Sequence, residues 1–210
     1  MHILVFGDSE AYGAFGKQGG WVARLRRYAD EKSNYGQKYY CLVYNMSISG
    51  DTSAGVLKRF DAETKLRLDD EKDDLFIISI GANDSMFIHS KKDTQVLLKD
   101  FRKNIQSIIN KARKYSGKIA FIGLLPADES KVDPIPWHKI GSYKNKYIKQ
   151  FNGALKEVCS KNNVLFIDNY EKWTKTDYKK LLIDGVHPNT AGHKKLYETV
   201  KNFLEKENLI

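Results

Sequence analysis

The sequence predicts an α/β protein in which helices cover both faces of a parallel β-sheet. Five short apolar runs have the length of strands and no clear alternation with polar residues, which is typical of strands buried on both faces. Parallel neighbours need crossover connections, so strands alternating with helices predict a doubly wound sheet, and the 210 residues suit a single domain over 1–210. The runs occupy residues 2–6, 41–46, 75–80, 118–124 and 164–168.

Apolar residues spaced three or four positions apart predict helices over 94–115, 140–160 and 190–206. We interpret these stripes as core packing, and expect His193, inside the last helix, at the surface. The loop 126–138 is the longest irregular segment and a candidate wall for a substrate site. The stripes are Leu97, Phe101, Ile105, Ile108 and Ala112; Ile140, Tyr143, Tyr147, Phe151, Leu155 and Val158; and Leu196, Val200 and Phe203.

Composition narrows the class of protein. No apolar run approaches the roughly 18 residues that span a bilayer, and the amino terminus does not have the pattern of a signal peptide, so we expect no membrane span and a cytoplasmic location. The lysines behind the net charge of +9 are scattered, so we expect no nucleic-acid partner. Cys41 and Cys159 are too few for a disulfide scaffold. Without a CxxC or HExxH spacing, we expect neither a metal nor a cofactor.

The first strand leads directly into a candidate nucleophile. The run 3–6 is followed by Gly7, Asp8 and Ser9, which places a hydroxyl at the carboxyl end of a strand, where open α/β sheets carry their chemistry. Gly-Asp-Ser is also ordinary turn composition. A catalytic Ser9 therefore requires a base, an orienting acid and oxyanion donors elsewhere in the chain.

The second and third strands end in candidate oxyanion donors. Gly50 offers a backbone N–H with no side chain to block it, and Asp51 or Thr52 is placed to cap the following helix. Asn83, in the Gly-Ala-Asn-Asp stretch after the third strand, can aim its amide N–H at a developing negative charge.

The loop before the last helix holds a candidate base and its partner. Asp184 and His187 lie three residues apart, so the carboxylate can accept from one imidazole nitrogen and leave the other free to take the serine proton. The carboxyl ends of parallel strands share one edge of a sheet, so these residues are expected to meet Ser9 there.

Together these motifs resemble the blocks of the SGNH, or GDSL-type, hydrolases over about residues 2–204. The resemblance implies a flavodoxin-like three-layer α/β/α sandwich with a five-stranded parallel sheet. It also implies a Ser9 nucleophile, a His187 base and an Asp184 orienter. The oxyanion donors that it implies are the backbone N–H groups of Ser9 and Gly50 and the side chain of Asn83.

Substrate choice is less sharply indicated. Many family members have leucine at the position of Glu10. A carboxylate there favours a small acyl group over a long apolar acyl chain. We expect Glu10, Trp137 and His138 to be substrate-binding residues. The predicted function is a small-acyl (acetyl) esterase on a carbohydrate or another small-molecule alcohol. The alternatives are a thioesterase or lysophospholipase for longer chains and a catalytically silent ligand-binding module.

Overall fold

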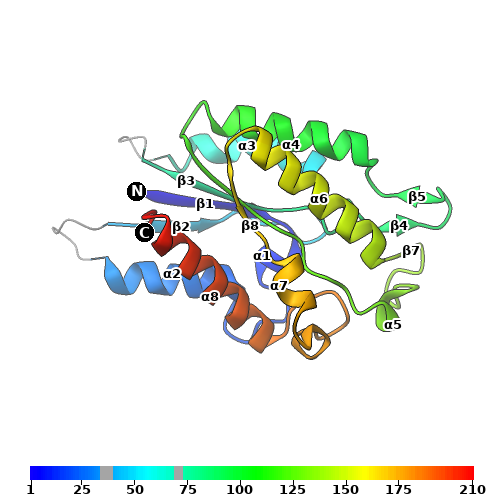
Figure 1. The fold of residues 1–210 in the computed structure, drawn as a ribbon. Helices are drawn as coiled ribbons and strands as arrows, with labels where there is room; N and C mark the ends of the chain where they lie inside the picture. The colour runs from blue at the N-terminus through cyan, green and yellow to red at the C-terminus, as the bar shows by residue number, and fades with distance from the viewer. Residues whose placement is uncertain (34–39, 69–72) are drawn as a thin grey trace.

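A computed structural model describes residues 1–33, 40–68 and 73–210. A parallel sheet forms the middle layer (Figure 1). One face is covered by α3 (Ser53–Lys65), α4 (Leu98–Ala112) and α6 (Asn145–Lys161), and the other by α2 (Gly20–Lys32) and α8 (Thr190–Lys206). The predicted α/β/α sandwich is therefore confirmed. The sheet consists of β1 (His2–Gly7), β2 (Leu42–Asn45), β3 (Leu75–Ser79), β6 (Lys118–Ile122) and β8 (Leu165–Ile167).

The five strands lie in the order β2-β1-β3-β6-β8, and each neighbouring pair is parallel. This is the flavodoxin-like order, in which the chain moves outward from β1 to β2 and then returns past β1 to β3. The carboxyl ends of β1 and β3 therefore flank the point where the winding direction changes. Open α/β sheets bind their ligands in the crevice at this point.

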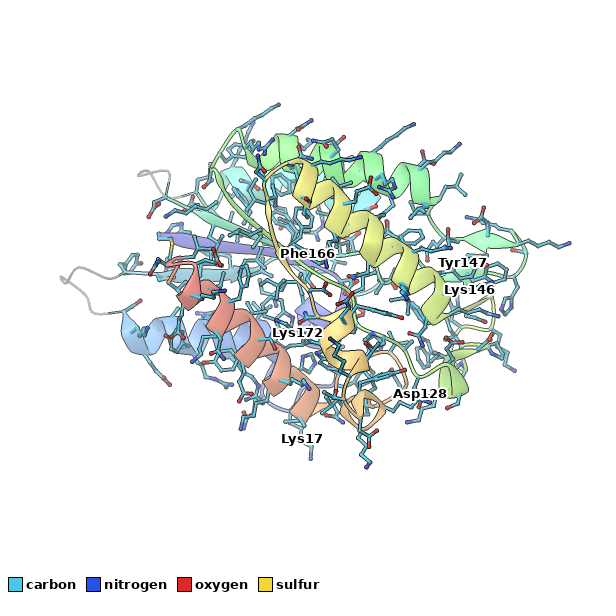
Figure 2. All side chains as sticks on the ribbon, in the orientation of Figure 1. Lys17, Asp128, Lys146, Tyr147, Phe166 and Lys172 are labelled. Atoms are coloured by element: carbon cyan, nitrogen blue, oxygen red, sulfur yellow. The ribbon has the colours of Figure 1, made fainter. Side chains whose placement is uncertain are left out.

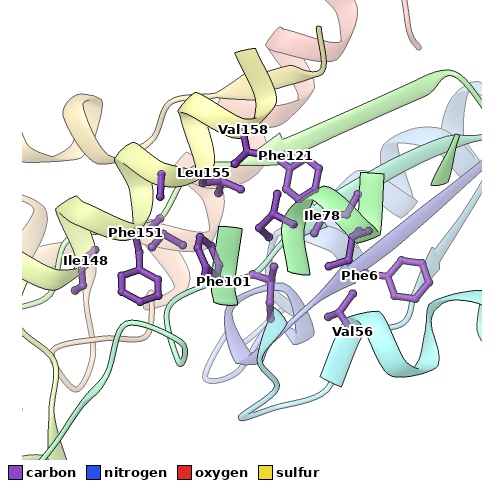
Figure 3. Packing of buried hydrophobic residues seen from close by; sticks show 14 of the residues in the cluster. Phe6, Val56, Ile78, Phe101, Phe121, Ile148, Phe151, Leu155 and Val158 are labelled. Carbon is purple, nitrogen blue, oxygen red and sulfur yellow. The ribbon is translucent and has the colours of Figure 1, made fainter. Parts of the chain in front are cut away.

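Two hydrophobic cores explain why the strands are apolar throughout. Along β1, Ile3 and Val5 face the core under α2 and α8, whereas Leu4 and Phe6 face the core under α3, α4 and α6. Figure 3 shows the second core from close by, with Phe6 near Val56. A strand between two cores needs apolar residues on both of its faces, so it lacks the polar alternation of a half-exposed strand.

The long helices follow the predicted segments with some shifts at their starts. The helices predicted over 94–115 and 140–160 begin later, so Ile140 and Tyr143 precede α6. The last helix begins at Thr190, where the Asn189 side chain accepts hydrogen bonds from two backbone N–H groups. The long helices are α2 (Gly20–Lys32), α3 (Ser53–Lys65), α4 (Leu98–Ala112), α6 (Asn145–Lys161) and α8 (Thr190–Lys206).

The expected surface position of His193 is wrong. This side chain is fully buried, and its Nε2 lies 3.0 Å from the carbonyl oxygen of Ala14. His193 precedes Leu196 by three residues and so lies on the same face of α8, which packs against the sheet. Its helical spacing from Leu196 already indicated a buried position. The expectation of a surface position rested on the polar character of the histidine side chain.

The loop over 126–138 is partly ordered and adjoins a second, small sheet. Glu129–Val132 forms a short helix, α5, and the segment after it leads into β7 (Gly141–Ser142). β7 pairs antiparallel with β4 (Phe87–Ile88), which pairs antiparallel with β5 (Asp93–Thr94). The shorter helices are α1 (Ser9–Tyr12), α7 (Tyr170–Thr174) and a 3₁₀ turn at Tyr178–Leu181.

The surface agrees with the expectation of scattered positive charge. Lys17, Lys146 and Lys172 project from different parts of the molecule (Figure 2). Cys41 and Cys159 are both buried, and no disulfide joins them. Within the described ranges, none of the helices is long and apolar enough to cross a membrane.

Candidate active site

The candidate nucleophile sits on a tight turn between β1 and α1. Asp8 caps α1, because its carboxylate accepts a hydrogen bond from the Glu10 N–H at 3.0 Å. Gly13 ends the helix with a left-handed φ of 92° and donates its N–H to the carbonyl of Ser9 at 3.1 Å. These contacts fix the Ser9 backbone at the carboxyl edge of the sheet.

Ser9, His187 and Asp184 form a chain of hydrogen-bonding contacts with His187 in the middle. His187 Nε2 is 2.9 Å from Ser9 Oγ, and His187 Nδ1 is 2.6 Å from Asp184 Oδ2. Half-burial acts to raise the pKa of Asp184, but hydrogen bonds from the His187 ring and from two backbone N–H groups outweigh it, so the pKa is lowered overall. Asp184 is thereby held as a carboxylate facing the imidazole.

The turn between Asp184 and His187 depends on the glycine that follows the aspartate. Gly185 has a φ of 101°, and a Cβ added there would lie 2.9 Å from the Cβ of Lys131. Its carbonyl also accepts the Asp128 N–H at 2.8 Å. A glycine therefore lets the loop bend back, so that Asp184 Oδ1 accepts the His187 N–H at 2.9 Å.

The predicted oxyanion donors gather beside the serine. Ser9, Gly50 and Asn83 all line one cavity. Gly50 follows β2 and has a φ of 79°, with nothing within 4 Å of an added Cβ. As expected for the start of α3, Thr52 caps the helix by accepting the Gly55 N–H.

The amide of Asn83 has a fixed orientation. Its Oδ1 accepts a hydrogen bond from the Tyr143 hydroxyl at 2.8 Å, and its Nδ2 donates to the Asp51 carbonyl at 2.9 Å. Nδ2 also lies 3.5 Å from Asp8 Oδ2. Because a tyrosine hydroxyl and a backbone carbonyl take opposite ends of the amide, the side of Asn83 that carries the N–H groups is defined.

A group of buried acids lies under the candidate site. Burial raises the pKa of Asp8 to about 7 and that of Asp84 to about 6, and it raises the pKa of Glu10 well above its ordinary value. Asp84 accepts hydrogen bonds from the N–H and the hydroxyl of Ser53. This ties the start of α3 to the loop after β3.

These buried acids predict a pH-dependent stability. An exposed aspartate in the unfolded chain has a pKa of about 4, whereas the pKa of Asp8 in the folded protein is about 7. Between these two pH values the folded protein binds more protons than the unfolded chain. The free energy of unfolding should therefore fall as pH rises from 4.5 to 7.5. We expect Asp8→Asn to reduce this slope, as measured by urea unfolding at several pH values.

The matched control for that experiment is Asp30→Asn. Asp30 is on α2, and its side chain is 51% exposed, so the control should keep the slope of the wild-type protein. Equal slopes for the wild-type protein and Asp8→Asn would show that Asp8 does not hold its proton in the folded state.

The cavity at the site has a volume of about 250 Å³. Trp137 and His138 line it, as expected, whereas Glu10 is not among its lining residues. Glu10 lies on the first turn of α1 and is buried beside Asp8, so the structure does not support its expected contact with substrate. The lining residues are Ser9, Ser49, Gly50, Asn83, Met86, Gln95, Ile135, Trp137, His138, Tyr143 and His187.

A second chamber of about 330 Å³ adjoins this cavity. Met86, Gln95 and His138 line both spaces, and Ile88 and Ile140 add apolar surface to the second. Met86 and Gln95 were not expected from the sequence. They lie next to the small sheet, whose strands of two residues are too short to give a periodic signal.

The site holds a serine hydroxyl, an imidazole and a carboxylate in line, with amide groups beside them, an arrangement that can support serine-hydrolase chemistry. The model of the GDSL-like Lipase/Acylhydrolase family matches residues 5–195, and the chain belongs to this family. It is therefore a carboxylic ester hydrolase. Within the described ranges, no group of three or more His, Cys, Asp or Glu side chains is placed to hold a metal ion.

Individual relatives agree with this assignment. The chain is 31% identical over 202 residues to Esterase TesA of Pseudomonas aeruginosa, an alignment that covers 94% of this chain and 85% of that protein. The crystal structure of TesA superposes with a TM-score of 0.71 at 26% identity and covers 100% of both chains. The lipase/acylhydrolase from Enterococcus faecalis shares the fold, with a TM-score of 0.77 at 24% identity over 98% of this chain and 96% of that one.

Proposed function

We propose that this ester hydrolase works through a Ser9–His187–Asp184 acyl-enzyme mechanism and removes small acyl groups, above all acetyl, from a carbohydrate or another small alcohol. The observation that carries the mechanism is the pair of contacts at His187. One ring nitrogen faces the serine hydroxyl at 2.9 Å and the other faces the Asp184 carboxylate at 2.6 Å. This geometry lets the ring accept one proton while its other nitrogen stays hydrogen-bonded.

Acylation begins when Ser9 Oγ attacks the ester carbonyl carbon. His187 Nε2 takes the hydroxyl proton as the new carbon–oxygen bond forms, and Asp184 stabilises the resulting imidazolium. The carbonyl oxygen becomes an oxyanion, which the N–H groups of Ser9 and Gly50 and the Asn83 amide are placed to stabilise. Collapse of this intermediate breaks the bond to the alcohol oxygen, which receives the proton from His187.

Deacylation repeats these steps with water as the nucleophile. His187 removes a proton from the water as its oxygen attacks the acyl carbon. The second tetrahedral intermediate uses the same oxyanion donors. When it collapses, the proton returns to Ser9 Oγ and the carboxylic acid is released.

The size and polarity of the cavity support a small acyl group. Its volume of about 250 Å³ is below the range of about 300–1,000 Å³ for drug-sized ligands. Ser49, Gln95 and His138 contribute polar groups to its lining. The adjoining chamber, with Ile88 and Ile140 in its wall, favours the alternative of a thioesterase or lysophospholipase acting on longer chains.

A series of p-nitrophenyl esters from acetyl to dodecanoyl distinguishes these two substrate classes. We expect kcat/KM to fall steeply beyond butyryl, because a longer chain does not fit the cavity at Ser9. A rise toward octanoyl would contradict the small-acyl proposal. In that case a longer chain would reach the second chamber, and a charge placed in its wall by Ile140→Asp should lower octanoyl turnover more than acetyl turnover.

A further inference from the structure

We propose that Phe15 and Trp137 form the subsite for the leaving alcohol, and that the alcohol they accept is a sugar ring. This proposal rests on the proposed Ser9–His187–Asp184 mechanism. The two aromatic side chains are 58% and 53% exposed, although burial of aromatic surface is favourable. They come from distant parts of the chain, one from the segment after α1 and the other from the loop after α5.

Both rings contact the same catalytic side chain. The ring centroid of Phe15 lies 5.3 Å from that of His187 in an edge-on arrangement. The centroid of Trp137 lies 6.2 Å from it at an interplanar angle of 40°. Single exposed apolar residues are common on protein surfaces, but two aromatic rings against one imidazole make a local apolar surface beside the candidate base.

The backbone of Phe15 supports a functional role for its ring. Phe15 has a φ of 61°, in the left-handed region that bulky residues rarely adopt. Such a conformation is energetically unfavourable for a bulky residue and persists where the surrounding structure imposes it. Burial of the ring does not offset this cost, since more than half of the side chain is exposed. A ligand bound at His187 would contact the exposed ring and bury its aromatic surface.

The mechanism determines which part of the substrate meets these rings. The carbonyl oxygen must face the donors at Gly50 and Asn83, and the alcohol oxygen must face His187 Nε2 in order to receive its proton. The group attached to that oxygen therefore leaves the site along the imidazole. Among the residues that the structure describes, Phe15 and Trp137 are the aromatic rings packed edge-on or tilted against this imidazole, so the alcohol passes over them.

A sugar fits this surface better than a simple aliphatic alcohol does. The C–H face of a pyranose ring packs on a flat aromatic ring, whereas its hydroxyl groups need hydrogen-bond partners. Ser49, Gln95 and His138 line the same cavity as Trp137 and carry such partners. Small-molecule sites combine apolar surface with a few polar groups in this way. A short alcohol such as ethanol would cover little of either ring.

Two acetyl esters that differ only in the alcohol test this assignment. A monoacetylated methyl glucopyranoside and ethyl acetate form the same acetyl-enzyme, so their deacylation is identical and kcat/KM reports the alcohol-dependent acylation. We expect Phe15→Ala and Trp137→Ala each to lower the ratio of the sugar-ester kcat/KM to the ethyl-acetate kcat/KM by about tenfold, as loss of one well-packed aromatic contact does.

Conservative variants and a surface control complete the experiment. Phe15→Tyr and Trp137→Phe keep a flat ring and should retain the wild-type ratio within about twofold. Leu66→Ala, at a residue that is 82% exposed after α3, should leave the rates for both substrates unchanged. If the alanine variants lower both rates equally, the rings position His187 rather than bind the alcohol, and the proposal is overturned; an unchanged ratio also overturns it. If the Ser9→Ala variant cleaves ethyl acetate as fast as the wild-type protein does, the proposed mechanism itself fails.

Discussion

Ser9→Ala is expected to lower kcat for ester hydrolysis on the order of a million-fold, the loss typical of removing a serine nucleophile. His187 would retain its contact with Asp184 at 2.6 Å but would have no hydroxyl to deprotonate. The oxyanion donors would still bind a carbonyl group, so weak residual turnover by water is expected. The burst of product released during acylation should disappear, because no acyl-enzyme forms.

A fluorophosphonate probe followed by intact-mass measurement checks the same residue directly. Wild-type protein should gain one adduct at Ser9, and Ser9→Ala should gain none. Ser160→Ala is the matched control, because Ser160 is an exposed residue near the end of α6, far along the chain from the site. A wild-type protein without an adduct would support the catalytically silent binding module, and full activity of Ser9→Ala would show that another group is the nucleophile.

The sheet and the candidate triad were predictable because their signals are local. Continuous apolar runs mark strands that face two cores, as Ile3 and Leu4 of β1 do on its opposite faces. Once the strands are parallel, their carboxyl ends must share one edge. The three-residue spacing of Asp184 and His187 then allows their contact within a single turn, so that only the meeting of this turn with Ser9 depends on the tertiary fold.

The parts that could not be predicted depend on side-chain direction and on segments without periodicity. Glu10 was expected to contact substrate because it follows Ser9, but the start of α1 turns its side chain into the protein beside Asp8. The small sheet of β4, β5 and β7 shapes the cavity, although each of its strands has only two residues. The contact between Tyr143 and Asn83 links residues 60 positions apart, and no local pattern encodes it.

Asn83→Ala is expected to reduce kcat by about 100- to 1000-fold, as loss of one oxyanion donor typically does. The donor strengthens its interaction only as the carbonyl oxygen gains negative charge, so KM should change little. The variant should stay folded, because the Asn83 side chain is only partly buried and the strand before it is held by β1 and β6. Steady-state kinetics and a thermal unfolding curve together check both expectations.

Tyr143→Phe separates the presence of the Asn83 donor from its orientation. Phenylalanine removes the hydroxyl that donates to Asn83 Oδ1 at 2.8 Å and keeps the ring, while the Asp51 carbonyl still holds Nδ2. We expect kcat to fall by about tenfold at nearly constant KM, because the loss of one neutral hydrogen bond weakens the orientation of the amide without removing it. Combined with Asn83→Ala, the tyrosine change should add almost nothing, since its effect passes through Asn83. A rise in KM at unchanged kcat for Asn83→Ala would instead mean that this amide binds the ground-state ester and is not an oxyanion donor.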